Sequence, residues 1–318
     1  MNEARQHRWQ AALGGLRADA LDCLQTTLAL VADHAHGSGA HAVLGCRWRL
    51  QVDEHDGLIG VRRSLDDRLE DAADLLGLEV VERWSELGGA DVRSLLASRS
   101  ALYLVGEAHD MPWLPYAGRR FMPHSFLLEA DGAAYTVVDA YHNNTQWGAA
   151  RPGAWTLTGD SLDRVLARGA IAMTLRAGRS SPAVDPLMVL TENGSRARSA
   201  EREIQRYVEA VQAQLDRAAA AEQLALDIWL LGRERLLHAI WLASLGRYAV
   251  EAAEADRLAE AWQRLATASY VAARRAQRGV AMARSIVDDL GDQLRADAAF
   301  AAGLRPHASV ATFPVTGQ

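Results

Sequence analysis

The chain has 318 residues, of which 49% are hydrophobic and 23% charged, and its formal net charge is −6. These values are typical of a globular protein of about two domains and argue against a general nucleic-acid binder, which needs a concentrated basic surface. Two cysteines exclude a disulfide framework, and neither a CxxC pair nor a Cys/His ladder indicates structural zinc. Because no signal-peptide core and no run of roughly 18 apolar residues is present, we expect a cytoplasmic protein without membrane contacts.

The first 176 residues mix helix and strand patterns. Asp22 is expected to cap a helix that runs to about Ala35, because apolar residues recur at helical spacing after it. Further along, the pattern predicts an amphipathic helix over 64–77, a strand over 78–84, a helix over 91–99, a strand over 101–107, a β-hairpin over 125–141 around Asp131-Gly132, and strand, short helix and strand over 153–176, the short helix capped by Asp160 or Ser161.

The remainder is helical by apolar periodicity. Residues 177–186 carry the Pro, Gly and Ser composition of a linker, and helices are predicted over 196–217, 219–245, 249–279 and 281–300. Four aromatic residues fall on apolar stripes that are typical of a bundle core, namely Trp229, Trp241, Trp262 and Tyr270. The sequence therefore predicts an α+β domain over 1–176, a helical domain over 187–303, and an irregular tail over 304–318.

Cys23 lies in the first turn of the helix that Asp22 caps. A helix N-terminus lowers the pKa of a thiol, and its free amides can bind an oxyanion. His124 opens the first hairpin strand and Asp139 closes the second, and a turn at Asp131-Gly132 sets the two almost opposite each other. The imidazole is then a candidate base for the cysteine, with the aspartate fixing its tautomer.

Five short segments carry a resemblance to a known family: DCLQTTLAL (22–30), VLGCRW (43–48), DMPWLPY (110–116), PHSFLLEA (123–130) and VVDAY (137–141). Together with the helical C-terminal part, they resemble the butirosin biosynthesis protein H-like acyltransferases. The resemblance covers residues near 20–175. It implies a papain-like cysteine protease fold followed by an all-α helical domain, with Cys23 as nucleophile, His124 as general base and acid, and Asp139 as orienting carboxylate.

The same resemblance implies the reaction. Its members move an acyl group from the thioester of an acyl or peptidyl carrier protein, through a cysteine, to an amine acceptor, in specialised metabolism such as antibiotic biosynthesis. The donor thioester would be carried on a phosphopantetheine arm, or on coenzyme A, and no bound cofactor or metal is needed. By charge sign alone, an acidic carrier protein could dock on arginines such as Arg119, Arg120, Arg274 or Arg275.

One departure weakens a peptidase interpretation, because no glutamine stands several residues before Cys23 to complete an oxyanion hole; Gln10 is too far upstream and Gln25 lies on the wrong side. A hydrolase with the same triad, either peptidase or thioesterase, nevertheless stays open, as does a non-catalytic scaffold with a vestigial triad. Homo-oligomer formation is also open. Candidate substrate-binding residues lie in the cysteine helix and in the segments before His124 and after Asp139: Gln25, Trp113, Tyr116, His142, Asn143 and Trp147.

Two further groups have structural interpretations. Cys46 lacks the partners of Cys23 and is interpreted as a packing residue. His34, His36 and His41 could form a metal cluster, but with no suitable carboxylate or cysteine at ligand spacing beyond Asp33 we interpret them as a solvated helix end.

Overall fold

The computed structural model describes residues 3–61 and 63–304, with side chains from residue 9 onward, and the chain divides into two compact units. Unit 1 comprises Met1–Leu44 and Arg63–Ala183, and unit 2 comprises Gly45–Arg62 and Val184–Gln318. Residues 45–62, which the sequence analysis placed in the first domain, therefore belong to the helical unit. The tail predicted to be irregular lies, from residue 305 on, outside the described residues.

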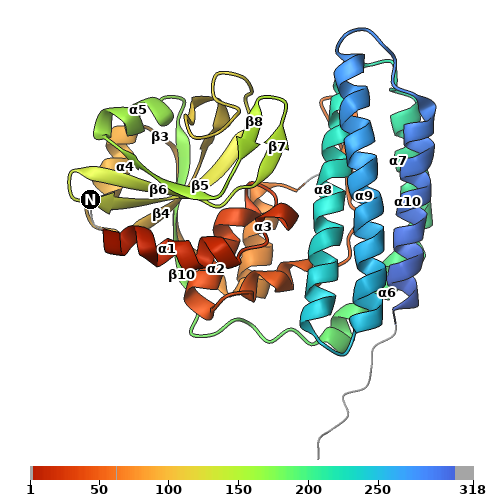
Figure 1. The fold of residues 1–318 in the computed structure, drawn as a ribbon, viewed down its shortest axis with the longest axis horizontal. Coiled ribbons are helices and arrows are strands. Elements are labelled where there is room, and N and C mark those ends of the chain that lie inside the picture. The colour runs from red at the N-terminus through yellow and green to blue at the C-terminus, as the bar shows by residue number, and fades with distance from the viewer. Residues whose placement is uncertain (1–2, 62, 305–318) are drawn as a thin grey trace, which may run out of the picture. The chain divides into compact units, whose positions relative to one another are not determined.

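The described chain is α+β, with a six-stranded antiparallel sheet in unit 1 and a largely helical unit 2 (Figure 1). The helices and turns of unit 1 are α1 (Glu3–Gly15), η1 (Ala18–Ala20), α2 (Gln25–His36), α3 (Leu65–Asp71), η3 (Ala72–Leu76), α4 (Gly89–Leu96), η4 (Ala108–Asp110) and α5 (Gly159–Val165), while η2 (Ala40–Gly45) ends where unit 2 begins. Its strands are β3 (Leu78–Leu87), β4 (Ala101–Glu107), β5 (Pro123–Asp131), β6 (Ala134–Asp139), β7 (Asn143–Thr145), β8 (Gly148–Ala150), β9 (Gly153–Leu157) and β10 (Ala170–Ala177). The sheet order is β3-β10-β4-β5-β6-β9, and β7 and β8 form a separate hairpin.

Helix α2 packs on the middle of this sheet. Its Leu28 and Ala32 share a buried apolar cluster with Tyr103 and Val105 of β4 and Met173 of β10. Tyr103 and Val105 point to one face of their strand because side chains alternate in a β-strand. The first turn of α2, which carries Cys23 just before it, is thereby held against the sheet near β5.

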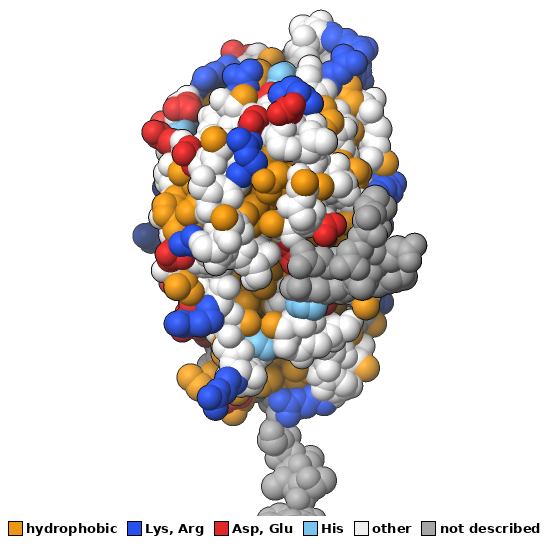
Figure 2. All heavy atoms as spheres, turned by 90° about the vertical axis from the view of Figure 1, so that its left-hand side faces the viewer, with side chains coloured by type: hydrophobic (Ala, Val, Ile, Leu, Met, Phe, Trp, Pro, Cys, Tyr) orange, Lys and Arg blue, Asp and Glu red, His pale blue; other side chains and the backbone are white. Residues whose placement is uncertain are grey.

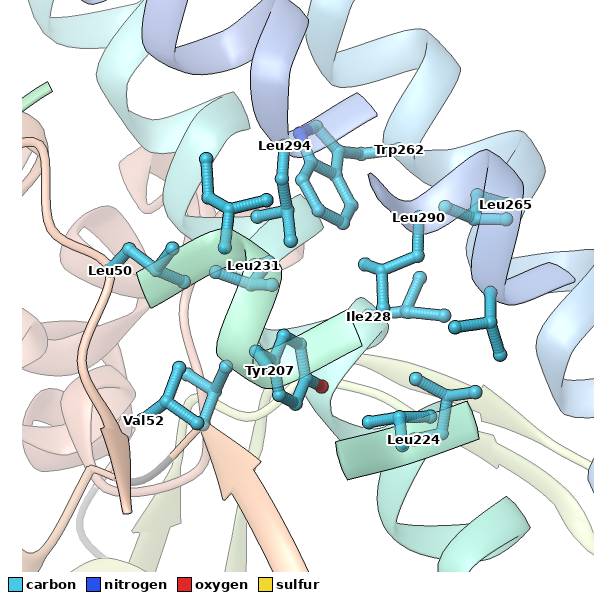
Figure 3. Close-up of a cluster of buried hydrophobic side chains, with 14 of the residues drawn as sticks. Leu50, Val52, Tyr207, Leu224, Ile228, Leu231, Trp262, Leu265, Leu290 and Leu294 are labelled. Carbon is cyan, nitrogen blue, oxygen red and sulfur yellow. The ribbon is translucent and has the colours of Figure 1, made fainter. Parts of the chain in front are cut away.

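Unit 2 is built from a short hairpin and long helices. Its elements are β1 (Val52–His55), β2 (Leu58–Val61), α6 (Pro186–Ser199), α7 (Glu201–Gln212), α8 (Ala218–Ser244), α9 (Ala249–Ala276) and α10 (Arg284–Gly303). The core of the unit gathers apolar side chains from the hairpin and from the helices, with Tyr207, Leu231 and Trp262 among its largest members (Figure 3). Gly232 lets α9 approach α8 closely, since a Cβ there would lie 3.3 Å from that of Trp262.

Buried hydrogen bonds explain why residues 45–62 join unit 2. Asn193 donates to the carbonyl of Cys46 at 2.8 Å and accepts the Trp48 amide at 2.9 Å. Arg235 donates to the carbonyl of Arg49 at 3.1 Å. Because these groups are buried between segments about 150 to 190 residues apart in sequence, periodicity along the chain could not have revealed them.

Most predicted elements are present, with three differences. The linker ends with Asp185 capping α6, whose proline stands in the first turn, so the first helix starts ten residues before the predicted residue 196 and breaks after Ser199. Helix α5 is capped by Thr158, whose hydroxyl accepts the Ser161 amide, and not by Asp160 or Ser161. The elements α1, β1, β2, β7 and β8 were not predicted.

The predicted bundle aromatics divide by burial. Trp262 and Trp241 are buried in unit 2 as expected. Trp229 is half-buried beneath the guanidinium of Arg233, and Tyr270 is 44% exposed, so Tyr270 is not a core residue. The apolar stripe predicted for α9 (Ala249–Ala276) thus includes Tyr270, a side chain that the rest of unit 2 leaves exposed.

None of the described helices is long and apolar enough to cross a membrane. On the face drawn in Figure 2, basic and acidic side chains are interspersed with apolar ones. This face therefore presents charges of both signs and not a continuous basic stripe.

Candidate active site

The β5–β6 hairpin brings His124 and Asp139 to one face of the sheet. Its two-residue turn is Gly132 and Ala133, with Gly132 at φ +64, one residue later than predicted. Leu127 pairs with Val138, so the continued register sets Asp139 beside Phe126 and His124 beside Tyr141. The predicted opposite pairing is wrong, but the shift is one residue on each strand and keeps both side chains on the same face as diagonal neighbours.

The carboxylate of Asp139 holds His124 in one tautomer. Its Oδ2 lies 2.7 Å from His124 Nε2, and both side chains are buried. The indole of Trp113 donates to the same oxygen at 2.9 Å, and the Tyr141 amide donates to Oδ1 at 2.9 Å. Because an ionised carboxylate only accepts hydrogen bonds, Nε2 carries the proton and Nδ1 carries the lone pair. That Nδ1 is buried and has no hydrogen-bond partner.

Cys23 contacts the residues on either side of this histidine in β5. Its Sγ is 3.5 Å from the carbonyl oxygen of Pro123, the residue directly before His124. Ser125, directly after it, donates to the carbonyl of Cys23 at 2.6 Å. The strand segment that carries His124 is thus joined on both sides to the cysteine. The thiol of Cys23 is not part of a disulfide and is only partly buried, as a nucleophile that meets a substrate must be.

Helix α2 begins at Gln25 and its N-cap residue is Leu24, which makes no side-chain cap bond, so Cys23 lies two residues before the helix and not in its first turn as predicted. Asp22 caps the turn that leads into α2. Its Oδ1 accepts the amides of Leu24 at 2.9 Å and Gln25 at 2.8 Å, and Oε1 of Gln25 accepts the Asp22 amide at 3.3 Å in return. This reciprocal arrangement is a capping box. It corrects one expectation, because the amides of Leu24 and Gln25 bind the cap and are not free for an oxyanion.

Tyr103 closes the site from β4. Its hydroxyl donates to the carbonyl of Leu24 at 3.2 Å. Burial raises the pKa of Tyr103 far above its ordinary value, and the neighbouring charges of Cys23 and Asp22 raise it further. The phenol therefore stays neutral and acts as a hydrogen-bond donor at the helix start.

The chain matches no protein-family model and no curated protein.

The predicted substrate-binding residues separate into three groups. Trp113 joins the triad by its bond to Asp139 and stacks on Trp155 with ring centroids 5.9 Å apart. Tyr116 is buried, and its hydroxyl accepts a hydrogen bond from the side-chain amide of Asn143 at 2.9 Å. Its ring lies edge-on to that of Trp147, with ring centroids 6.2 Å apart. Tyr116, Asn143 and Trp147 form a second cluster of aromatic and amide side chains, which we call the Tyr116 cluster.

Gln25 and His142 stand apart from that cluster. Gln25 is buried and its Oε1 accepts the Asp22 amide, so this oxygen has a structural role and is not presented to a substrate. His142 is half-buried between Tyr141 and β7. The Tyr116 cluster is linked to the triad through Tyr141, whose hydroxyl lies 3.3 Å from that of Tyr116 and whose ring meets His124 edge-on at 5.1 Å.

The histidines near the end of α2 have different surroundings. His34 is exposed, but His41 is buried, so interpreting all three as a solvated helix end is wrong for His41. Asp33 lies 2.8 Å from Nδ1 of His41, and the Arg17 amide donates to Nε2 at 3.2 Å. The contact between Asp33 and His41 stabilises the turn that follows α2. Within the described ranges, no group of three His, Cys, Asp or Glu side chains is placed to hold a metal ion.

Two site features were missed by sequence reasoning. Arg68 of α3 pairs with Asp22 behind the nucleophile, although its neighbours in DDRLED suggest a solvated helix face. Trp113 was predicted only as a substrate-binding residue, and its indole donates a hydrogen bond to the carboxylate of Asp139. Cys46, predicted to be a packing residue, is fully buried in unit 2.

Proposed function

We propose that the protein is a cysteine-dependent acyltransferase that forms an amide from an acyl thioester and an amine. The observation that carries the proposal is a partly exposed cysteine bound to the residues on both sides of His124, a buried imidazole whose Nδ1 has a lone pair and no hydrogen-bond partner. Asp139, at 2.7 Å from Nε2, keeps that lone pair on Nδ1. This order of nucleophile, base and orienting carboxylate supports assignment to a papain-like fold and to the butirosin biosynthesis protein H-like family.

In the first half-reaction His124 Nδ1 takes the proton of Cys23, and the thiolate attacks the carbonyl carbon of the thioester. The new bond joins Sγ to the acyl carbon, the bond from that carbon to the donor sulfur breaks, and the imidazolium returns its proton to the leaving thiolate. The aspartate stabilises the imidazolium that forms between these steps.

In the second half-reaction an amine attacks the acyl-cysteine. His124 takes a proton from the nitrogen, the carbon–sulfur bond breaks, and the proton passes to Sγ. The products are an amide and the free thiol, so the cycle needs neither nucleotide nor metal. A free thiol also fits the reducing cytoplasm that the two-cysteine composition suggests.

The surroundings of Pro123 support the proposed donor class. Arg119, Arg120 and Phe121 are exposed just before β5, and Phe121 is 58% exposed between the ring of His109 and the guanidinium of Arg168. A basic and apolar surface in the segment that precedes Pro123 suits an acidic acyl or peptidyl carrier protein that presents its thioester on a phosphopantetheine arm.

A product analysis tests the proposal. The wild type and Cys23→Ala are incubated with an acyl phosphopantetheine thioester and a panel of amines, and the products are separated by mass spectrometry. We expect amide that depends on Cys23. Free acid as the sole Cys23-dependent product would assign a hydrolase instead, and neither product would favour a scaffold.

A further inference from the structure

A buried ion pair lies directly behind the proposed nucleophile. Oδ2 of Asp22 accepts from Nε of Arg68 at 2.8 Å, and a second guanidinium nitrogen of Arg68 contacts the same oxygen. The side chain of Asp22 is 7% exposed and that of Arg68 is 3% exposed. Since Oδ1 of Asp22 is bound to the first amides of α2, the carboxylate links the start of α2 to α3.

This arrangement has an electrostatic consequence for Cys23. A helix N-terminus favours a thiolate, but a charged carboxylate in the cap, one residue away, opposes it. The opposition is strong in a buried site because little water screens the charges. The guanidinium of Arg68 offsets the charge of Asp22 where it is held.

We propose that Arg68 is a positioning residue for the reaction: it neutralises the capping carboxylate of Asp22, so that Cys23 ionises at neutral pH while α2 keeps its cap. This inference rests on the proposed role of Cys23 as nucleophile. It concerns a residue of α3 that touches the cap and not the reacting atoms.

The other titratable groups around Cys23 do not replace this cation. His124 on β5 is the base, and its Nε2 is bound to the carboxylate of Asp139 on β6. Tyr103 on β4 stays neutral because burial raises its pKa. Of these groups, Arg68 alone carries a permanent positive charge.

The test is the pH profile of Cys23 alkylation by iodoacetamide, followed at the level of the Cys23 peptide by mass spectrometry so that Cys46 does not contribute. Four full-length variants are compared with the wild type: Arg68→Met, Arg68→Lys, Asp22→Asn, and the double variant Asp22→Asn/Arg68→Met. Circular dichroism and thermal unfolding establish that each is folded.

We expect opposite shifts. Arg68→Met raises the midpoint of the profile by about one pH unit, because it leaves a carboxylate uncompensated near the thiol. Asp22→Asn lowers the midpoint, because it leaves Arg68 uncompensated while asparagine still caps the helix. Arg68→Lys stays near the wild type, and the double variant returns toward it.

A folded Arg68→Met protein with the wild-type midpoint overturns the inference. So does a double variant whose midpoint stays as far from the wild type as that of Arg68→Met. If Arg68→Met does not fold, Asp22→Asn decides alone, and an unchanged or raised midpoint refutes the electrostatic role. Failure of the proposed function has a different signature, because an enzyme that forms no acyl adduct can still show the predicted alkylation profiles.

Discussion

Replacing Asp139 by asparagine tests how the site holds His124. The carboxylate accepts three hydrogen bonds, from His124 and Trp113 on Oδ2 and from the Tyr141 amide on Oδ1. Trp113 and the Tyr141 amide can only donate. An asparagine has one oxygen, so in either orientation its NH₂ group faces a donor.

With the NH₂ toward the Tyr141 amide, only that amide loses its acceptor and the His124 tautomer is kept, so the loss of acylation arises in the opposite orientation. With the NH₂ toward His124, the imidazole must turn its lone pair to Nε2, its proton moves to Nδ1, and Nδ1 can no longer accept from Cys23. The indole of Trp113 also loses its acceptor, which costs about 1–3 kcal/mol for a buried donor. The equivalent change of tautomer in a serine protease triad lowers turnover on the order of 10⁴-fold, and we expect a loss of roughly 10²- to 10⁴-fold in acylation here.

The assay is the single-turnover rate of acyl-Cys23 formation, measured by quench and intact-protein mass spectrometry, with urea unfolding in parallel. Asp131→Asn is the matched control, since it makes the same chemical change at the turn end of the same hairpin. We expect the control to keep the wild-type rate. A folded Asp139→Asn protein that acylates within threefold of the wild type would show that the tautomer argument is wrong.

Three further predictions concern single contacts. Trp113→Phe removes one bond to Asp139 but keeps the His124 tautomer, so acylation falls only about fivefold, as the loss of about 1 kcal/mol implies. Burial lowers the pKa of His238 to about 4, from an ordinary value of 6.5. Between pH 6.5 and 4 the unfolded chain therefore binds a proton that the folded chain does not bind. Urea unfolding should show the free energy of unfolding falling by about 3 kcal/mol as the pH drops through this range. Gly45→Ala places a Cβ 2.2 Å from the carbonyl oxygen of Leu237, so the same assay at pH 7 shows a loss of about 3 kcal/mol.

Matched variants make these predictions specific. For the histidine, His238→Asn keeps a donor toward the carbonyl of Gly45, which His238 Nδ1 meets at 2.7 Å, and removes the titrating group. Its stability should change less on acidification, and an unchanged pH slope would contradict the assignment. For the glycine, Gly303→Ala meets nothing within 4 Å and should leave unfolding almost unchanged.

Local signals fixed most elements of unit 1 in advance. The apolar runs on either side of Asp131-Gly132 gave the hairpin, and alternation of side chains gave the shared face of His124 and Asp139 even though the turn lies one residue later. The same kind of signal was overlooked at Asp56-Gly57, where both residues have positive φ and join β1 to β2. Only the strand after this turn is apolar, because β1 reads Val-Asp-Glu-His, so the hairpin signal is weaker here than at Asp131-Gly132.

Other features had no local signal. The guanidinium of Arg68 is buried because Asp22, 46 residues away, needs a partner, whereas its own segment looks solvated. The attachment of residues 45–50 to unit 2 depends on Asn193 and Arg235, far along the chain. Such polar contacts are specific to tertiary structure, and periodicity reports only which face of an element is apolar.

The most direct test of the account is the location of the acyl group after mixing the protein with an acyl thioester. Intact and peptide mass spectrometry are applied to the wild type, Cys23→Ala and Cys46→Ala, with an amine added afterwards. The account predicts an adduct on Cys23 in the wild type and in Cys46→Ala, none in Cys23→Ala, and loss of the adduct as amide when the amine is added. An unmodified wild type, or an adduct confined to Cys46, would contradict it.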